Sequence, residues 1–227
     1  MSNKLALELN GEPIAFEVRQ AIVAGYTGRD LRKVRAHIEE LERQGIAAPP
    51  SVPTLYRIDP GLITLGTEID ARNRPLSGEV EAALLLRSGR LEDALVAVAS
   101  DFTDRDEERR SIQRSKEFAK PLSRQVWSYA AVRGCWDQIA SRSWVEPGPN
   151  AALYQSGTLE ALYRPEELLE RLCMKPGAGL AGTVVLMGTV PLLAGTFQFT
   201  DYFACELETP EHATLALHCR VLHNSAR

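Results

Sequence analysis

The sequence of 227 residues lacks several features that mark common classes of protein. Its four cysteines contain no C-x-x-C pair, which in a chain of this size predicts free thiols and a reducing compartment (Cys135, Cys173, Cys205 and Cys219). No run reaches the ~18 apolar residues of a membrane span. The first 18 residues have neither the basic segment nor the apolar core of a secretory signal. We therefore expect a cytoplasmic protein with no membrane partner.

An excess of positive charge is also missing. The chain has 26 Lys and Arg against 30 Asp and Glu, so its net charge is −4, and this charge is spread along the sequence. Such a balance argues against a nucleic-acid partner. The one basic stretch, RDLRKVR (29–35), is followed by EELER (39–43), so the segment predicts a solvated helix face of mixed charge.

Two further motifs are absent. The glycine-rich segment 173–183 has no Lys-Thr pair of a phosphate-binding loop, and we expect an ordinary connection there. Histidines and a cysteine gather near the C-terminus, at positions 212, 218, 219 and 223. Adjacent strand residues point to opposite faces, and so do residues five apart, so these side chains cannot converge on zinc.

Short strand-like segments and a few helices alternate along the chain. Residues 5–18 predict a hairpin with its turn at Asn10-Gly11. Residues 27–45 predict a helix that is capped at Thr27, has Asp30 three residues later and ends at Gly45. Other predicted helices are 103–119, 123–141 and 165–173, and predicted strands are 54–58, 62–69, 79–86, 94–102, 181–190, 195–208 and 214–224. This pattern predicts an α+β protein built on a rolled or sandwiched sheet.

Acidic residues lie at the start of one buried strand and the end of the next. In LSGEVEAALLL (76–86), Glu79 and Glu81 point to the same face of a strand. The next apolar strand ends in Asp101, and antiparallel pairing would bring all three carboxylates to one rim of the sheet. Three neighbouring carboxylates repel one another, and a divalent cation removes that cost. The constellation therefore predicts a Mg²⁺ or Mn²⁺ site, although an E-x-E pair alone is more often a solvated strand face.

The order of several motifs resembles that of the fumarylacetoacetate hydrolase superfamily. That family has an E-x-E strand, a D-x-T-x-R-D segment, a later lysine, a G-x-T segment and a G-T near the end of an apolar strand. The chain has these in order as EVE (79–81), DFTDRD (101–106), SKEF (115–118), SGT (156–158) and VVLMGT (184–189), preceded by H-x-x-E at 37–40. The chain looks like a bacterial branch of this superfamily, and the resemblance implies a mixed β-roll or sandwich with peripheral helices.

The resemblance implies roles for individual residues. It implies that Glu79, Glu81 and Asp101 hold the metal, with Lys116 beside the developing oxyanion, although Lys120 is an alternative lysine. It implies a substrate pocket that includes Arg105, Thr158, Gly188 and Thr189. Residues 188–195, GTVPLLAG, depart from the G-T-P-x-G-V of the family, as does Asp30 from its asparagine, which leaves the substrate open.

His37 is the candidate base for activating water, because histidine titrates near neutral pH. On a helix, Glu40 lies one turn further along and can fix the tautomer of the imidazole. A solvated pair on a charged helix is the alternative. The helix is expected to act as a lid over the site.

Together these features predict a metal-dependent hydrolase that cleaves a carbon–carbon bond in a small 2-oxo or diketo acid. A decarboxylase, hydratase or isomerase on the same metal site stays open, as does a non-catalytic metal- or ligand-binding protein. Relatives usually form homodimers, so we expect one here. Residues 1–60 are expected to form a hairpin and lid-helix region, and residues 61–227 a metal-binding β-roll, within one continuous unit.

Overall fold

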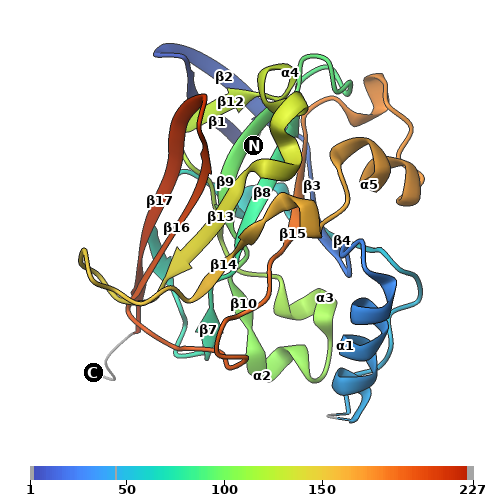
Figure 1. Cartoon of the computed structure of the whole chain (residues 1–227), viewed down its shortest axis with the longest axis vertical. Coiled ribbons are helices and arrows are strands. Elements are labelled where there is room, and N and C mark those ends of the chain that lie inside the picture. The colour runs from blue at the N-terminus through green and yellow to red at the C-terminus, as the bar shows by residue number, and fades with distance from the viewer. Residues whose placement is uncertain (1–2, 44, 224–227) are drawn as a thin grey trace.

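Two sheets form the framework of the molecule (Figure 1). The computed structural model describes residues 3–43 and 45–223, so the outer limits of the two predicted regions, residues 1 and 227, lie outside it. The larger, mixed sheet has the strand order β2 (Glu12–Val18), β1 (Asn3–Leu9), β12 (Gln125–Ser128), β9 (Leu95–Ser100), β8 (Val80–Leu86), β15 (Thr183–Thr189), β3 (Gln20–Gly25) and β4 (Thr54–Ile58).

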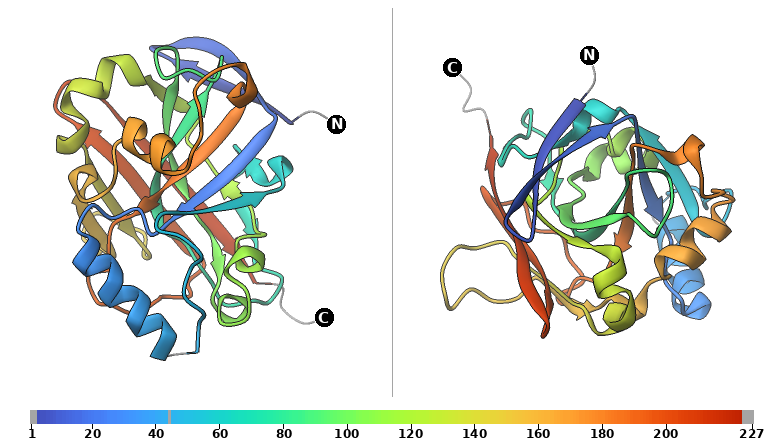
Figure 2. Two further views of the ribbon diagram at one scale, coloured as in Figure 1. Left: turned by 90° about the vertical axis from the view of Figure 1, so that its right-hand side faces the viewer. Right: turned by 90° about the horizontal axis from the view of Figure 1, so that it is seen from above.

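The second sheet has five strands, in the order β14 (Gln155–Thr158), β13 (Ala140–Trp144), β16 (Tyr202–Thr209), β17 (His212–Leu222) and β6 (Glu68–Asp70). Short pairs join β7 (Leu76–Ser77) to β10 (Thr103–Asp104), and β5 (Ile63–Thr64) to β11 (Lys120–Pro121). Seen from above, the strands curl around a common centre (Figure 2). The α+β prediction is thereby confirmed.

Helices cover the ends and sides of the sheets. The α-helices are α1 (Leu31–Arg43), α2 (Arg105–Glu108), α3 (Ile112–Ser115), α4 (Tyr129–Val132) and α5 (Pro165–Arg171), and 3-10 turns span Pro60–Leu62, Arg133–Gln138, Leu159–Ala161 and Ala178–Leu180. Helices α1, α2 and α3 lie at one end of the molecule, and the β1–β2 hairpin lies at the other (Figures 1 and 2). Among the described residues, no helix has the length and apolar character needed to cross a membrane.

Strand β8 is buried on both faces, which explains its unbroken apolar sequence. All seven of its residues are buried. Val80, Ala82, Leu84 and Leu86 belong to the core between the two sheets, while Ala83 and Leu85 belong to a second core with the β1–β2 hairpin. Burial on both faces is what a central strand requires. Glu81 shares the face of Ala83 and Leu85 and so faces the interior.

Several predicted elements are confirmed. The β1–β2 hairpin pairs Leu9 with Glu12 around Asn10 and Gly11, both of which have positive φ. Positive φ at both central positions is the geometry that an Asn-Gly turn supplies. Helix α5 begins at Pro165, as predicted, and all four cysteines are free thiols.

Helix α1 is shorter than predicted and has a different cap. The side chain of Asp30 accepts hydrogen bonds from the backbone amides of Arg32 and Lys33, so Asp30 rather than Thr27 caps the helix. Thr27 is buried, and its carbonyl accepts the amide of Tyr163. Val34 is buried, whereas Leu31 is 42% exposed. The helix therefore rests lightly on the rest of the molecule.

The predictions of long helices at 103–119 and 123–141 were wrong. The first segment begins with strand β10 at Thr103–Asp104 and then forms two short helices, α2 and α3, joined by a turn. In the second, Gln125–Ser128 pairs with β1 and β9 as strand β12, and only α4 and a 3-10 turn follow before β13. The aromatic side chains of this segment are buried, with Trp136 only 1% exposed. Strand β16 begins at Tyr202, so residues 195–201 of another predicted strand form a loop.

Candidate active site

The three acidic residues meet where β8 begins and β9 ends. The strands pair antiparallel, with Val80 opposite Ser100 and Glu81 opposite Ala99. Beyond that register, the amide of Asp101 donates to the carbonyl of Glu79 at 3.0 Å. Glu81 is 3% exposed and Asp101 is fully buried. The backbones of the three residues therefore lie at one rim of the sheet, as antiparallel pairing of the two strands predicts.

Asp101 is bound by two lysines, one on each of its carboxylate oxygens. Lys116 Nζ lies 2.5 Å from Oδ2 and Lys120 Nζ lies 3.0 Å from Oδ1. Burial by itself would raise the pKa of Asp101, but the two ammonium groups outweigh it and hold this pKa below its usual range. Both lysines left open by the sequence thus contact the same aspartate.

The two lysines differ in their surroundings. Lys116 also donates to Thr103 Oγ1, and its side chain is 10% exposed. Burial opposes its charge, yet Asp101 and then Glu79 raise its pKa. Lys120 is fully buried and donates to the carbonyl of Phe102, and burial lowers its pKa to about 8. Lys116 therefore stands on the more accessible side of Asp101.

Glu81 is a buried carboxylate that is held by a backbone amide. Gly188 N donates to Glu81 Oε2 at 2.7 Å. The pairing of β15 with β8 is irregular between Leu186 and Thr189, and Gly188 has φ +94°. A Cβ atom at Gly188 would come within 2.0 Å of Thr27 Oγ1, so this backbone position requires glycine. Burial, followed by the negative charge of Asp101, raises the pKa of Glu81 well above its usual value.

Glu79 is paired with a buried arginine. Arg105 Nη2 lies 2.8 Å from Glu79 Oε2, Nε donates to Ser77 Oγ, and Nη1 donates to both oxygens of Glu108. The ring of Phe197 covers the guanidinium, with its centroid 3.7 Å from Cζ. Burial opposes the charge of Arg105, but Glu79 and Glu108 raise its pKa. Arg105, proposed from the resemblance to bind substrate, is engaged by protein groups on every donor nitrogen.

Thr189 is connected to the same rim, and Thr158 lies further away in the second sheet. Thr189 Oγ1 donates to the carbonyl of Val80 and accepts from Gln155 Nε2. Gln155 is fully buried, and its side-chain oxygen accepts the amide of Val80. Thr158 pairs with Ala140 in the five-stranded sheet. Gln155 was missed because nothing in its spacing separates it from an ordinary strand residue.

His37 and Glu40 lie on the exposed side of α1. Their side chains are 59% and 58% exposed, with 3.8 Å between His37 Nδ1 and Glu40 Oε2. The His37 ring lies 6.4 Å from the ring of Tyr26. Burial raises the pKa of Tyr26, and the charge of Glu108 adds to this, while Lys116 opposes it. The charges of Glu108 and Lys116 therefore act on Tyr26, whose ring lies near His37.

The carboxylates point to cationic side chains rather than to one common centre. Within residues 3–43 and 45–223, no three Asp, Glu, His or Cys side chains are arranged to hold a metal ion. The ion pairs of Glu79 and Asp101 explain this arrangement. To bind a metal, these two residues would have to exchange a cationic partner for it, while Glu81 has no such partner to lose among the described ion pairs.

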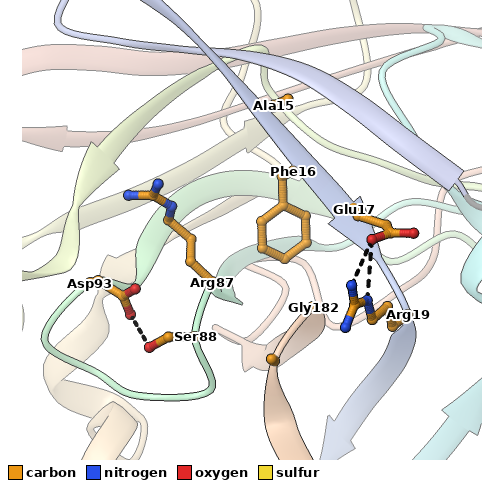
Figure 3. A pocket seen from close by; sticks show the side chains of 9 residues that line it. Ala15, Phe16, Glu17, Arg19, Arg87, Ser88, Asp93 and Gly182 are labelled. Atoms are coloured by element: carbon orange, nitrogen blue, oxygen red, sulfur yellow. Dashed lines mark hydrogen bonds and ion pairs between the residues drawn. The ribbon is translucent and has the colours of Figure 1, made fainter. Parts of the chain in front are cut away.

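A separate hollow of about 340 Å³ lies at the other end of β8 (Figure 3). Arg87 follows that strand, so the hollow lies about 20 Å along β8 from Glu81. Arg19 is paired there with Glu17, and Ser88 with Asp93. Its charged groups are largely matched within the protein, so the acidic rim remains the stronger candidate.

A family model described as "Protein of unknown function (DUF2848)" matches residues 24–218. The chain belongs to this family. No curated protein matches the chain.

The fold was also compared with those of solved structures. A fumarylpyruvate hydrolase from Pseudomonas aeruginosa in complex with Mn²⁺ and pyruvate has a TM-score of 0.65 at 16% identity, covering 96% of each chain. A 5-carboxymethyl-2-hydroxymuconate delta-isomerase from Mycobacterium smegmatis has a TM-score of 0.61 at 18% identity, covering 92% of this chain and 80% of that one. A fumarylacetoacetate hydrolase family protein of yeast scores 0.62 at 17% identity, covering 92% and 95%. The fold is that of the fumarylacetoacetate hydrolase family, which confirms the resemblance.

Proposed function

We propose that the chain is a divalent-metal-dependent hydrolase that cleaves a carbon–carbon bond in a small 2-oxo or diketo acid. The observation that carries this proposal is the buried carboxylate of Glu81. Its pKa is raised by burial and then by the charge of the neighbouring Asp101. A buried anion without a cationic partner is costly. A nearby dication would offset that cost, and carboxylate oxygens are the ligands that Mg²⁺ and Mn²⁺ prefer.

Glu79, Glu81 and Asp101 would hold the metal, with Mg²⁺ or Mn²⁺ as the ion. A bound dication supplies Lewis acidity at a substrate oxo group. The donor set is suitable in type, and Glu79 and Asp101 would turn from Arg105 and Lys116. A crystal of one similar hydrolase contains Mn²⁺ and pyruvate, which supports this assignment for the present chain.

Side chains of this chain would perform the remaining steps. Lys116, which donates a hydrogen bond to Thr103, would supply an ammonium group where negative charge develops on the substrate. His37 would take a proton from water, with Glu40 fixing its tautomer, and the hydroxide would attack the distal carbonyl carbon. The bond to the oxo-acid fragment then breaks, and that fragment leaves as its enolate. Thr189, Gly188, Thr158 and Arg105 are proposed to line the substrate pocket.

The location of α1 favours a second candidate. Because His37 is 59% exposed on a lightly packed helix, a reaction for which His37 is less essential stays open on the same metal site. Isomerisation, decarboxylation and hydration are such alternatives, and one structure of similar fold is a delta-isomerase. A metal-binding protein without turnover is a third. For each, we propose a cytoplasmic homodimer without nucleic-acid or membrane partners.

The decisive experiment measures metal and turnover together. Metal content of the purified protein and calorimetric titration with Mg²⁺ and Mn²⁺ should give about one ion per chain, and acylpyruvates should then be cleaved. Lys116→Met should lower kcat about 100-fold or more, because an oxyanion-stabilising group is lost. Lys120→Met is the matched control and should retain more activity. Absence of metal uptake would refute the proposal, and metal binding with no turnover of any oxo acid would favour the binding protein.

A further inference from the structure

Exposed apolar side chains gather beside the acidic rim. Among the described residues, six large hydrophobic side chains are exposed, and four of them belong to two adjoining loops: Leu153, Leu193, Phe197 and Phe199. The loop of residues 190–201 connects β15 to β16 and is fastened to residue 154. Leu193 N donates to the carbonyl of Tyr154, and Gln198 N donates to its hydroxyl. Exposed apolar surface in one place marks a binding site more often than isolated residues do.

Phe197 brings this apolar surface to the acidic cluster. One face of its ring covers Arg105 at 3.7 Å, yet the residue remains 39% exposed. The same guanidinium lies 2.8 Å from Glu79. Only the Arg105 side chain therefore separates the Phe197 ring from Glu79 of the proposed metal site, and part of the ring surface is open to a ligand.

The charge around Arg105 determines what kind of group can lie there. Its Nη1 donates to both oxygens of Glu108 and its Nε to Ser77, so Glu108 balances its single positive charge even when Glu79 turns to the metal. A negatively charged end of a ligand would find little attraction beside Phe197 and would be repelled by Glu108. An apolar group, in contrast, gains ring contact and covers exposed surface.

We propose that Phe197 determines substrate specificity, and that the substrate is a 2-oxo acid with an aromatic or bulky apolar substituent rather than a second carboxylate. This inference rests on the proposed function, because the oxo-acid end is taken to bind at the acidic rim. It also gives a physical role to the segment after Gly188-Thr189, where the sequence departs from the G-T-P-x-G-V pattern.

The test compares phenylpyruvate with pyruvate as calorimetric ligands of the Mn²⁺-loaded protein. Wild-type protein should bind phenylpyruvate about tenfold more tightly than pyruvate, the scale of one good aromatic contact. Phe197→Ala should reduce this ratio to about threefold or less, and Phe197→Leu should give an intermediate ratio because it retains apolar surface. Phe199→Ala, which removes a ring two residues away, should retain most of the preference.

The outcomes separate the two proposals. If pyruvate binds and phenylpyruvate binds no more tightly, or if Phe197→Ala leaves the ratio as in the wild type, the specificity inference is wrong and the oxo-acid site stands. If neither ligand binds the wild-type protein in the presence of Mn²⁺, the proposed function fails and the inference falls with it.

Discussion

The residues proposed for metal binding and catalysis lie on the acidic rim and on helix α1. Those on the rim are mostly buried, and those on α1 are exposed. Glu81, Asp101 and Lys120 are buried, and each charge there depends on its neighbours. His37 and Glu40 are more than half exposed and lie 3.8 Å apart. Charges within the rim are thus part of the stability of the molecule, whereas the pair on α1 is nearly independent of it.

The sequence motifs of the acidic rim and of α1 can be recognised equally well, but the charges of the two motifs differ in what they contribute to folding. A buried ion pair that loses one partner leaves an uncompensated charge in a poorly solvated place. An exposed pair is screened by water and contributes little to folding. Substitutions in the two regions should therefore separate effects on folding from effects on turnover.

The largest expected effect comes from Asp101→Asn. This change leaves the buried ammonium groups of Lys116 and Lys120 without their shared anion, so the free energy of unfolding should fall by ~3–5 kcal/mol. Urea denaturation of the metal-free protein measures this. Adding Lys116→Met to Asp101→Asn should recover part of the loss. A loss below about 1 kcal/mol for the single variant would mean that the network contributes little.

An intermediate effect, with a distinct pH dependence, is expected for Glu81→Gln. The pKa of Glu81 is raised in the folded state, so above the unfolded pKa of about 4.3 the folded state keeps a proton that the unfolded state has lost. Glu81 therefore makes the wild type less stable as the pH rises from about 4.3 to its raised pKa in the folded state. Glutamine cannot ionise, so the variant should lose this contribution and be more stable by ~1–2 kcal/mol near neutral pH without metal.

Urea denaturation in EDTA at pH 5 and pH 7.5 tests this expectation. The contribution from Asp101, whose pKa is lowered, is present in both proteins. Glu40→Gln, on exposed α1, is the matched control and should follow the wild type. A stability difference between Glu81→Gln and the wild type that stays constant across pH would contradict the assignment of a raised pKa to Glu81.

The smallest effect on stability is expected for His37→Ala. Because the side chain is 59% exposed, its removal should change the free energy of unfolding by less than ~1 kcal/mol. Under the proposed hydrolase, the same change should lower kcat by about 10²–10⁴, the range for loss of a general base, with metal affinity retained. Glu39→Gln, a neighbouring surface change, is the control. Full activity of His37→Ala would favour a reaction that needs no activated water.

The sequence was informative about the fold where local chemistry and tertiary structure agree. Asn10-Gly11 predicted the hairpin, Pro165 the start of α5, and the unbroken apolar run of β8 a buried strand. Residues 125–128 show where such reasoning fails. They lie in a segment that was predicted to be a helix, but pairing with β1 and β9 decides their conformation. That pairing involves strands that are distant in the sequence, so no local pattern contains it.

At the site, the sequence predicted which acidic residues approach one another because strand pairing and alternation are regular. It could not predict that Asp101 would be shared by two lysines, since this depends on how α3 and β11 return to the sheet. It also missed Gln155 and Phe197, whose importance comes from contacts across the two sheets and across a loop. The predicted roles of the site residues remain to be tested by the variants above.

The bend of β15 at Gly188 has a practical consequence for spectroscopy. Since the Gly188 amide donates a hydrogen bond to the Glu81 carboxylate, the resonance of this amide in a ¹H–¹⁵N spectrum should shift as the carboxylate gains a proton or a metal. Glycine amides occupy an uncrowded region of such spectra. One peak, followed through a pH or Mg²⁺ titration, would thus report the ionisation of Glu81 without any attached probe.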